Sequence, residues 1–272
     1  MKSIKLKAGN EIPLLGFGTW RLKGKEATES VKKALDTGYR HIDTADAYEN
    51  HRDIADALKE SSVNREELFI TSKIWRDRLS YDNIKNDAER FLNELEIGYL
   101  DLLLIHWPNK NSNFKESLKA LKEVQESGIA RAIGVSNFTI NHLKDALEYE
   151  PELISLNQVE FHPTLYQKEL LDFCRENNIA LTAYSPLGRG EVFKNKVIQE
   201  LADKYGKTPA QLSLRWLVEK DIAAIPKASS SPHIKENYDI FGWEMPDEAV
   251  EKIDQLNNNN RIIDPGFGEF DY

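Results

Sequence analysis

Short apolar runs of strand length alternate with amphipathic helical segments along almost the whole chain. Eight such runs follow one another from Leu14 onward: LLGFG, RHID, ELFITSK, YLDLLLIHW, ARAIGVSNF, LISLNQVEF, IALTAYSPL and IAAIPKA. Strands separated by helices are typical of a parallel sheet, and eight such units in 272 residues favour closure into a barrel. We therefore predict an α/β fold, a single (β/α)8 TIM barrel domain over residues 1–272. The segment MKSIKLKAGNEIP, with its Gly9-Asn10 turn, predicts an N-terminal β-hairpin in front of it.

The main rival fold is an open, doubly wound sheet with a dinucleotide-binding loop. Such a loop needs a third glycine, but after Gly16-x-Gly18 that place is taken by Arg21. The pair Gly188-x-Gly190 fails in the same way. The open sheet is therefore disfavoured.

The helices are predicted from a 3.6-residue apolar period and from their stop signals. Gly38 is expected to end the first helix. The expected helices are Glu26 to Thr37, one after Tyr48, one around Ile84 to Leu95, Phe114 to Ser127, Lys168 to Asn177, helices across 196–219 and a last one near 233–240.

Three consecutive strands carry an ionisable residue at the carboxyl end. Asp43 ends RHID, Lys73 ends ELFITSK, and His106 lies next to the end of YLDLLLIHW. Their spacings of 30 and 33 residues match the roughly 30 residues of a βαβ unit. Burying an Asp in mid-strand is costly, whereas at a strand end it can meet a partner or a ligand. We expect these side chains at one edge of the sheet, with Tyr48 on the loop above.

The later strands also end in polar or aromatic residues, at Ser136-Asn137, Asn157-Gln158, Tyr184-Ser185 and Lys227. Taken singly, each is better explained as a turn residue. In a barrel, however, all these strand ends lie on the carboxyl-terminal face, where active sites of this fold are built. A ring of such residues predicts a ligand site on that face.

The charge balance argues against nucleic acid as a ligand. With 36 Lys and Arg against 45 Asp and Glu, the formal net charge is −9, and the basic residues form no run. The chain lacks the apolar stretch of a signal peptide and the ~20 apolar residues of a membrane-spanning helix. We expect a cytoplasmic protein that binds neither nucleic acid nor membrane. We interpret the sequon Asn137-Phe138-Thr139 as a chance occurrence and not as a glycosylation site.

Cysteine and histidine usage gives little support to disulfide or metal chemistry. The single cysteine, Cys174, excludes an internal disulfide and is expected to pack in the core. A metal site built from Asp43, His106 and His162 is an alternative reading, but no closely spaced pair of ligands supports it. We predict no metal.

Several stretches of the chain match one family, in order and at that family's spacing. They are GYRHIDTADAY, SKIW, LLLIHWP, AIGVSNF, LNQVEFHP, AYSPLG and IPKASSSPHIKEN. Over essentially its whole length the chain resembles the aldo-keto reductases. The resemblance implies a (β/α)8 barrel that binds NADP(H) in extended form and reduces aldehydes or ketones to alcohols by hydride transfer.

By that resemblance the catalytic tetrad is Asp43, Tyr48, Lys73 and His106. A carbonyl that receives a hydride needs a proton in the transition state, and Tyr48 is expected to supply it. The Lys73 cation is expected to lower the phenol pKa, Asp43 to hold Lys73, and His106 to orient the carbonyl oxygen. A plain buried ion pair between Asp43 and Lys73 is the alternative, but such pairs add little net stability.

The resemblance also implies the cofactor and substrate contacts. Ser136, Asn137 and Gln158 are expected to hydrogen-bond the nicotinamide carboxamide, and Tyr184 to stack on its ring. Further cofactor contacts are expected at Gly18, Thr19, Asp43, Ser185, Leu187, Lys227, Ser229, His233 and Asn237. Trp20, Trp75 and Trp107 are expected to wall an apolar substrate pocket beside Tyr48 and His106, although each Trp alone fits a core position almost equally well.

Two departures from the family pattern bear on the site. His51 stands where the family often has Glu or Gln, and we expect little consequence because it lies outside the tetrad. In IPKASSSPHIKEN, Ala228 replaces a hydroxyl residue, and His233 replaces an Arg that stacks on adenine and touches the 2′-phosphate. Lys227 and Ser229 remain, so we expect NADP(H) to be preferred, with NAD(H) as the alternative cofactor.

The loops beyond the strands are short, as in WPNKNSN and the tail RIIDPGFGEFDY. Short loops predict an open site for a small carbonyl substrate: small aldehydes, dicarbonyls or open-chain sugars. We expect a monomer or a weak oligomer. An alternative of another class stays open, because the family includes cofactor-sensing or structural barrels without turnover.

Overall fold

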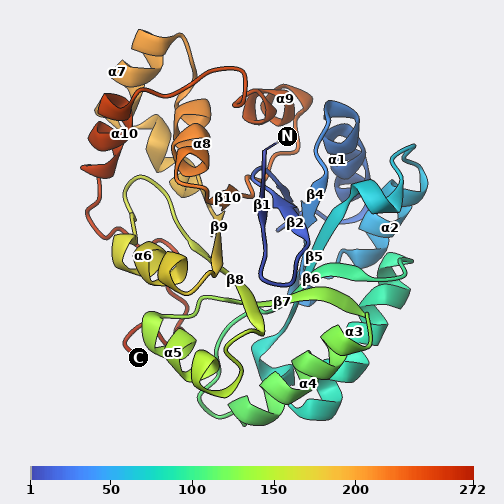
Figure 1. The fold of residues 1–272 in the computed structure, drawn as a ribbon. Helices are drawn as coiled ribbons and strands as arrows, with labels where there is room; N and C mark the ends of the chain where they lie inside the picture. Colours follow the sequence, from blue (N-terminus) through green and yellow to red (C-terminus); the bar gives the residue numbers. More distant parts are fainter. Residues whose placement is uncertain (1) are drawn as a thin grey trace.

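The structure, a computed structural model that describes residues 2–272, is a ring of parallel strands surrounded by helices (Figure 1). Within these residues the central sheet has eight strands in sequence order from β3 to β10. They are β3 (Phe17–Gly18), β4 (His41–Asp43), β5 (Phe69–Ile74), β6 (Leu100–Ile105), β7 (Ala130–Ser136), β8 (Ile154–Glu160), β9 (Ala180–Tyr184) and β10 (Ala223–Ala224). Each strand pairs in parallel with its neighbour.

The first and last strands of the sheet are joined to each other. Leu15 bridges Ala224 in parallel. The Ala224 N–H donates to the Leu14 carbonyl at 2.9 Å, and the Gly16 N–H donates to the Ala224 carbonyl at 2.8 Å. These bonds close the sheet, and the predicted (β/α)8 barrel is confirmed.

The helices form the outer layer of the barrel (Figure 1). They are α1 (Gly24–Thr37), α2 (His51–Lys59), α3 (Tyr81–Leu95), α4 (Phe114–Glu126), α5 (Ile140–Tyr149), α6 (Lys168–Glu176), α7 (Lys196–Tyr205), α8 (Pro209–Glu219), α9 (Ser231–Tyr238) and α10 (Asp247–Asp254). Short 3-10 turns lie at η1 (Asp46–Tyr48), η2 (Arg65–Glu67), η3 (Arg76–Arg78) and η4 (Gly188–Phe193).

Local sequence explains where most helices begin and end. Gly38 ends α1 in the left-handed region, at φ 117°, a conformation that glycine adopts without steric cost. Ser80 caps α3 by accepting the Asn83 N–H. The helices α5 and α10 were not predicted. Only His142, Leu143 and Ala146 are buried in α5, and only Ala249 and Ile253 in α10, and so short a stripe gives little period.

The predicted N-terminal hairpin is also present. It pairs β1 (Ser3–Lys5) antiparallel with β2 (Glu11–Pro13). Its side chains reach the amino-terminal ends of the barrel strands: Lys7 Nζ donates to the Pro151 carbonyl and Asn10 Nδ2 to the Asp101 carbonyl. The hairpin thus covers the amino-terminal end of the barrel. The carboxyl-terminal end stays open to ligands. That the chain forms one domain remains a prediction from the sequence.

Candidate active site

A cavity of about 630 Å³ lies at the carboxyl-terminal ends of the strands. Its lining includes fifteen of the residues predicted from the sequence: Gly18, Thr19, Trp20, Asp43, Tyr48, Trp75, His106, Trp107, Ser136, Asn137, Gln158, Tyr184, Ser185, Leu187 and Lys227. Lys73 lies fully buried beneath it, against Asp43. Parallel strands place their carboxyl ends at one edge, so residues far apart in the chain meet here.

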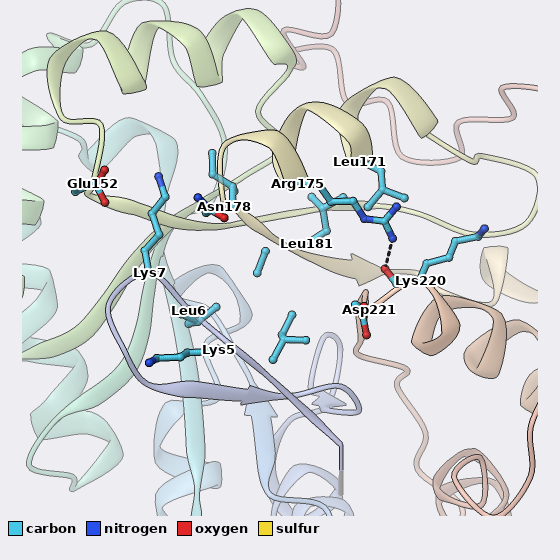
Figure 2. Close-up of a pocket in the computed structure, with 13 residues that line it drawn as sticks. Lys5, Leu6, Lys7, Glu152, Leu171, Arg175, Asn178, Leu181, Lys220 and Asp221 are labelled. Carbon is cyan, nitrogen blue, oxygen red and sulfur yellow. Dashed lines mark hydrogen bonds between the residues drawn. The ribbon is translucent and has the colours of Figure 1, made fainter.

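A second cavity, of about 460 Å³, opens at the opposite end of the barrel beneath the hairpin (Figure 2). Three of the basic side chains that line it are engaged by the protein itself. Lys7 donates to the Pro151 carbonyl, Arg175 donates to the Lys220 carbonyl (dashed in Figure 2), and Lys220 pairs with Asp254. The predicted catalytic groups lie at the other end, so the carboxyl-terminal cavity is the candidate site.

Asp43, Lys73 and Tyr48 form a continuous polar chain. Lys73 Nζ lies 2.5 Å from Asp43 Oδ1 and donates to the Thr44 carbonyl at 2.9 Å. The same ammonium lies 3.4 Å from the Tyr48 hydroxyl. Lys73 is 0% exposed and Asp43 1%, so both charges are held away from water. Electrostatic interactions are stronger in the protein interior than in water.

The second oxygen of Asp43 links the tetrad to the far side of the barrel. Gln158 Nε2 donates to Asp43 Oδ2 at 2.7 Å. The backbone carbonyl of Gln158 accepts from Ser136 Oγ at 2.8 Å. Strand β8 is therefore joined to strand β4 across the barrel, a contact between residues 115 positions apart.

Burial dominates the acid–base behaviour of the tetrad. Burial raises the pKa of Tyr48 well above its ordinary value, and Asp43 and Tyr184 raise it further. The lowering of this pKa that is expected from Lys73 is therefore opposed by removal of the phenol from water, and it stays a prediction. Burial lowers the pKa of Lys73, with Asp43 opposing it. Burial, aided by Lys73, lowers the pKa of His106.

These shifts leave Tyr48 protonated and His106 neutral near pH 7. The His106 ring lies edge-on to Tyr48, with centroids 5.7 Å apart, and edge-on to Trp75 at 5.3 Å. Tyr48 can donate a proton, and a neutral imidazole can donate a hydrogen bond from one ring nitrogen. Both groups line the same cavity, so one carbonyl oxygen can meet both.

The predicted carboxamide ligands form a bonded cluster. Asn137 Nδ2 donates to the His106 carbonyl and to Ser136 Oγ, while Asn137 Oδ1 accepts from the Tyr184 hydroxyl at 2.7 Å. The amide of Asn137 is thus engaged by protein groups. Gln158 uses its Nε2 on Asp43, which leaves its side-chain oxygen Oε1, an acceptor suited to a carboxamide N–H₂.

The loop after β9 contains several left-handed residues. Ser185, Gly188, Arg189 and Gly190 have φ values of 47°, 54°, 50° and 102°. Turns of this kind can point backbone N–H groups toward an anion, although those of Gly188 and Gly190 donate to the Ser185 and Leu187 carbonyls. Arg189 lines the cavity and lies 4.8 Å from the centre of the Trp20 ring. The family resemblance implied a pyrophosphate clamp at Ser185, Leu187 and the backbone of SPLGRG, but the Arg189 side chain was missed, although its place between two glycines beyond a strand end was a usable signal.

The segment after β10 reaches the cavity only in part. Lys227 lines it, whereas Ser229 lines a separate surface pocket beside α1. His233 is exposed in the first turn of α9, where its backbone N–H is capped by Ser230, and Asn237 is buried farther along that helix. Ser229, His233 and Asn237 therefore lie outside the cavity lining, farther along the segment that begins at Lys227.

The wall of the cavity is aromatic, and the C-terminal tail contributes to it. Phe267 lies edge-on to Trp75 and Trp107, with centroids 5.7 and 5.4 Å apart. Ile263 and Pro265 also line the cavity. The sequence indicated only that the tail is brief and the site open. Its role became visible only in three dimensions, because the aromatic residues of PGFGEFDY carry no periodic signal.

The tail is held at both ends by polar contacts. The backbone N–H groups of Ile262 and Ile263 donate to the Glu160 carboxylate, each at 2.9 Å. Thr139 Oγ1 donates to the Tyr272 carbonyl at 2.9 Å. His162, the third residue of the alternative metal site, lies 3.1 Å from Glu160. Residues 2–272 contain no cluster of three His, Cys, Asp or Glu side chains arranged to hold a metal.

No helix within residues 2–272 has the length and apolar character needed to cross a membrane. The Cys174 thiol is buried in α6, and burial raises its pKa to about 12. It is therefore a core side chain and not a reactive thiol.

Comparison with known proteins gives one consistent result. The model of the aldo/keto reductase family matches residues 14–258. Glyoxal reductase of Bacillus subtilis (strain 168) is 44% identical over 261 residues, covering 96% of this chain and 94% of that protein. Methylglyoxal reductase of Escherichia coli (strain K12) is 39% identical, covering 95% of this chain and 94% of that protein.

Solved structures agree with the sequence comparison. An aldo-keto reductase from a Medee basin deep-sea metagenome library superposes with a TM-score of 0.95 at 37% identity, covering 99% of this chain and 100% of that one. A Bombyx mori aldo-keto reductase in complex with NADP gives a TM-score of 0.91 at 32% identity, covering 97% and 95%. The matches span the barrel and every strand end that lines the cavity. This chain belongs to the aldo/keto reductase family.

Proposed function

We propose that this protein reduces aldehydes and ketones to alcohols with NADP(H), using Tyr48 as the general acid. The observation that carries the proposal is the buried Lys73, whose ammonium touches both Asp43 and the Tyr48 hydroxyl at the floor of an aromatic cavity. A buried ion pair is a poor source of stability. A role in a proton-donating site explains the presence of the pair better than a role in stability.

The residues of the site take distinct parts in this reaction. When bound, NADPH supplies the hydride to the carbonyl carbon. Tyr48 gives its hydroxyl proton to the carbonyl oxygen, and the Lys73 ammonium stabilises the phenolate that remains. Asp43 holds Lys73 in place and favours its charged form. His106 donates a hydrogen bond to the same carbonyl oxygen and so orients the substrate.

The donor and acceptor set fits an extended dinucleotide. Gln158 offers a carbonyl oxygen to the carboxamide, and Tyr184 offers an aromatic face to the nicotinamide. Gly18, Thr19, Ser136 and Asn137 border the same region, and Ser185 and Leu187 begin the loop that suits the pyrophosphate. Lys227, with Ser229, His233 and Asn237 beyond it, is proposed to bind the adenosine end. NADP(H) is preferred in this proposal, and NAD(H) is the alternative.

The substrate is proposed to be a small carbonyl compound. The names of the relatives, glyoxal reductase and methylglyoxal reductase, support dicarbonyls. The wall of Trp20, Trp75, Trp107 and Phe267 favours apolar aldehydes over open-chain sugars, whose hydroxyl groups need hydrogen-bond partners. Cytoplasmic location and a monomeric or weakly associated state remain predictions from the sequence.

The test is consumption of NADPH by the purified protein with a panel of aldehydes, ketones, dicarbonyls and open-chain sugars. We expect turnover with methylglyoxal and with an aromatic aldehyde. Binding of NADPH without turnover on any carbonyl would contradict the proposal and favour the cofactor-sensing alternative.

A further inference from the structure

His51, the first residue of α2, occupies a buried position directly behind the tetrad. Its side chain is 4% exposed. Nδ1 lies 2.8 Å from Glu94 Oε2 on α3, and Nε2 lies 2.9 Å from Ser72 Oγ on β5. The ring also packs edge-on to Phe91, with centroids 4.9 Å apart. Both ring nitrogens are therefore used, and each is bonded to a different element.

The bond to Ser72 connects His51 to the strand that carries Lys73. Ser72 and Lys73 are neighbours on β5, and successive residues of a strand point to opposite faces of the sheet. Lys73 accordingly points into the barrel toward Asp43, while Ser72 points outward to the helices. A hydrogen bond that holds Ser72 also holds the backbone from which Lys73 extends.

The segment that carries Tyr48 is tied to α3 on both sides of the tyrosine. On the amino-terminal side, Asp46 accepts from Arg90 at 2.8 Å, and Arg90 also bonds Glu94 at 2.9 Å. On the carboxyl-terminal side, His51 contacts the same Glu94. Tyr48 thus lies on a short bridge whose two ends are fixed to one helix.

The charged groups around His51 determine its protonation state and its tautomer. Glu94, Arg90 and Asp46 are the charged groups that influence it. Burial lowers the pKa of His51, with Glu94 opposing this effect, so the ring is neutral near pH 7. Since a carboxylate only accepts, Nδ1–H donates to Glu94, and Nε2 accepts the Ser72 hydroxyl proton.

We propose that His51 is a positioning residue: by joining the Tyr48 segment to β5 it sets the approach of Lys73 to the Tyr48 hydroxyl. The inference rests on the carbonyl reduction proposed above. The separation of 3.4 Å between Lys73 Nζ and the Tyr48 oxygen is already at the long end for a hydrogen bond. Any loosening removes the contact, and small misplacements of reacting groups can reduce rates by up to about 10²-fold.

The two arms of His51 can be separated by substitution. Asn places an amide near the position of Nδ1 and keeps the bond to Glu94, whereas Gln reaches the position of Nε2 and keeps the bond to Ser72. Ser72→Ala removes the strand arm and leaves His51 unchanged. Ser117→Ala is the matched control, because Ser117 is a fully buried serine on α4 that donates to the Leu79 carbonyl, away from the tetrad.

The experiment measures kcat, KM and NADPH Kd for these variants. We expect Ser72→Ala and His51→Asn to lower kcat about 10-fold with Kd unchanged, and the double variant to lose no more than either alone. His51→Gln should stay within about threefold of wild type. Equal kcat in Ser72→Ala and Ser117→Ala, or equal losses in His51→Gln and His51→Asn, would reduce His51 to a packing residue.

A second measurement does not depend on turnover. Hydrogen–deuterium exchange of residues 44–50 in the cofactor-free protein should be about 10-fold faster in Ser72→Ala and His51→Asn than in wild type or Ser117→Ala. Unchanged exchange overturns the proposal about His51. Absence of wild-type turnover on every carbonyl would instead overturn the proposed reduction. Faster exchange in the variants would still establish that His51 and Ser72 hold the Tyr48 segment to β5.

Discussion

The two ends of the active-site cavity are built differently. At the catalytic end, Asp43 and Lys73 are buried and bonded to each other, to Gln158 and to the Thr44 carbonyl. At the opposite end, Arg189 and Lys227 are exposed cations on loops. The catalytic end is thus preorganised by the protein, as transition-state stabilisation requires. We propose that an anionic ligand completes the other end.

This difference separates the expected effects of substitution. Changes at the preorganised end should reduce kcat and spare cofactor binding. Changes at the open end should alter cofactor affinity and spare the chemical step, because the contacts there are equal in ground and transition states.

The largest effect is expected for Tyr48→Phe. This substitution removes the proton donor and keeps the ring, so kcat should fall at least about 10²-fold while NADPH Kd stays near the wild-type value. Steady-state kinetics with methylglyoxal and a fluorescence titration with NADPH provide the two numbers. Retained turnover would mean that another residue, or water, protonates the carbonyl oxygen.

Lys73→Met is expected to lower kcat by about 10- to 100-fold, because the phenolate formed in the reaction loses its neighbouring cation. The same change leaves Asp43 buried without a partner, which typically destabilises a protein by about 3–5 kcal/mol. The control is Lys73→Met combined with Asp43→Asn. Thermal unfolding should show recovered stability in the double variant, and kinetics should show no recovered activity. Recovered activity would assign Lys73 a structural role alone.

At the open end, Lys227→Ala tests recognition of the 2′-phosphate. A charge-assisted bond to that group accounts for an expected preference of NADPH over NADH of about 10- to 100-fold, or about 1.4–2.8 kcal/mol. Lys227→Ala should remove most of that preference by weakening NADPH and leaving NADH unchanged. Both Kd values must be measured, since equal weakening of the two cofactors would show that Lys227 does not contact the 2′-phosphate.

His233→Arg should have a smaller effect of the opposite sign. The exposed first turn of α9 gives an arginine room to reach an adenosine phosphate, and its planar guanidinium binds phosphate in two places at once. NADPH affinity should rise about fivefold, with NADH affinity and kcat unchanged. A similar gain for NADH would place the new side chain on the adenine or the pyrophosphate.

The smallest effect is expected from pH. The pKa of Tyr48 is raised by burial, so the acid form persists at alkaline pH, and the pKa of His106 is lowered by burial, so it stays neutral in weak acid. The reduction rate at saturating NADPH should therefore change less than about threefold between about pH 6 and pH 9. A decline centred inside that range would mean that a group other than Tyr48 and His106 governs the step, and Lys73, whose pKa burial lowers, would be the first candidate.

Much of the site could be predicted because it follows from the chain's repeating pattern. Apolar runs identify the strands, and parallel strands bring their carboxyl ends together, so Asp43, Lys73, His106 and Tyr184 had to meet once the barrel was recognised. Resemblance to the family then supplied roles that residue types and spacing leave open. These parts depend on local sequence and on a topology that admits few alternatives.

Other features depend on contacts between segments with no common pattern, and only the tertiary structure decided them. Sequence reasoning set His51 aside, but packing of α2 against α3 and β5 places it on Glu94 and Ser72. Phe267 became part of the cavity wall because the tail folds back onto Trp75 and Trp107. The pKa of Tyr48 is raised mainly by burial, and the degree of burial is a property of the assembled fold that residue order along the chain does not express.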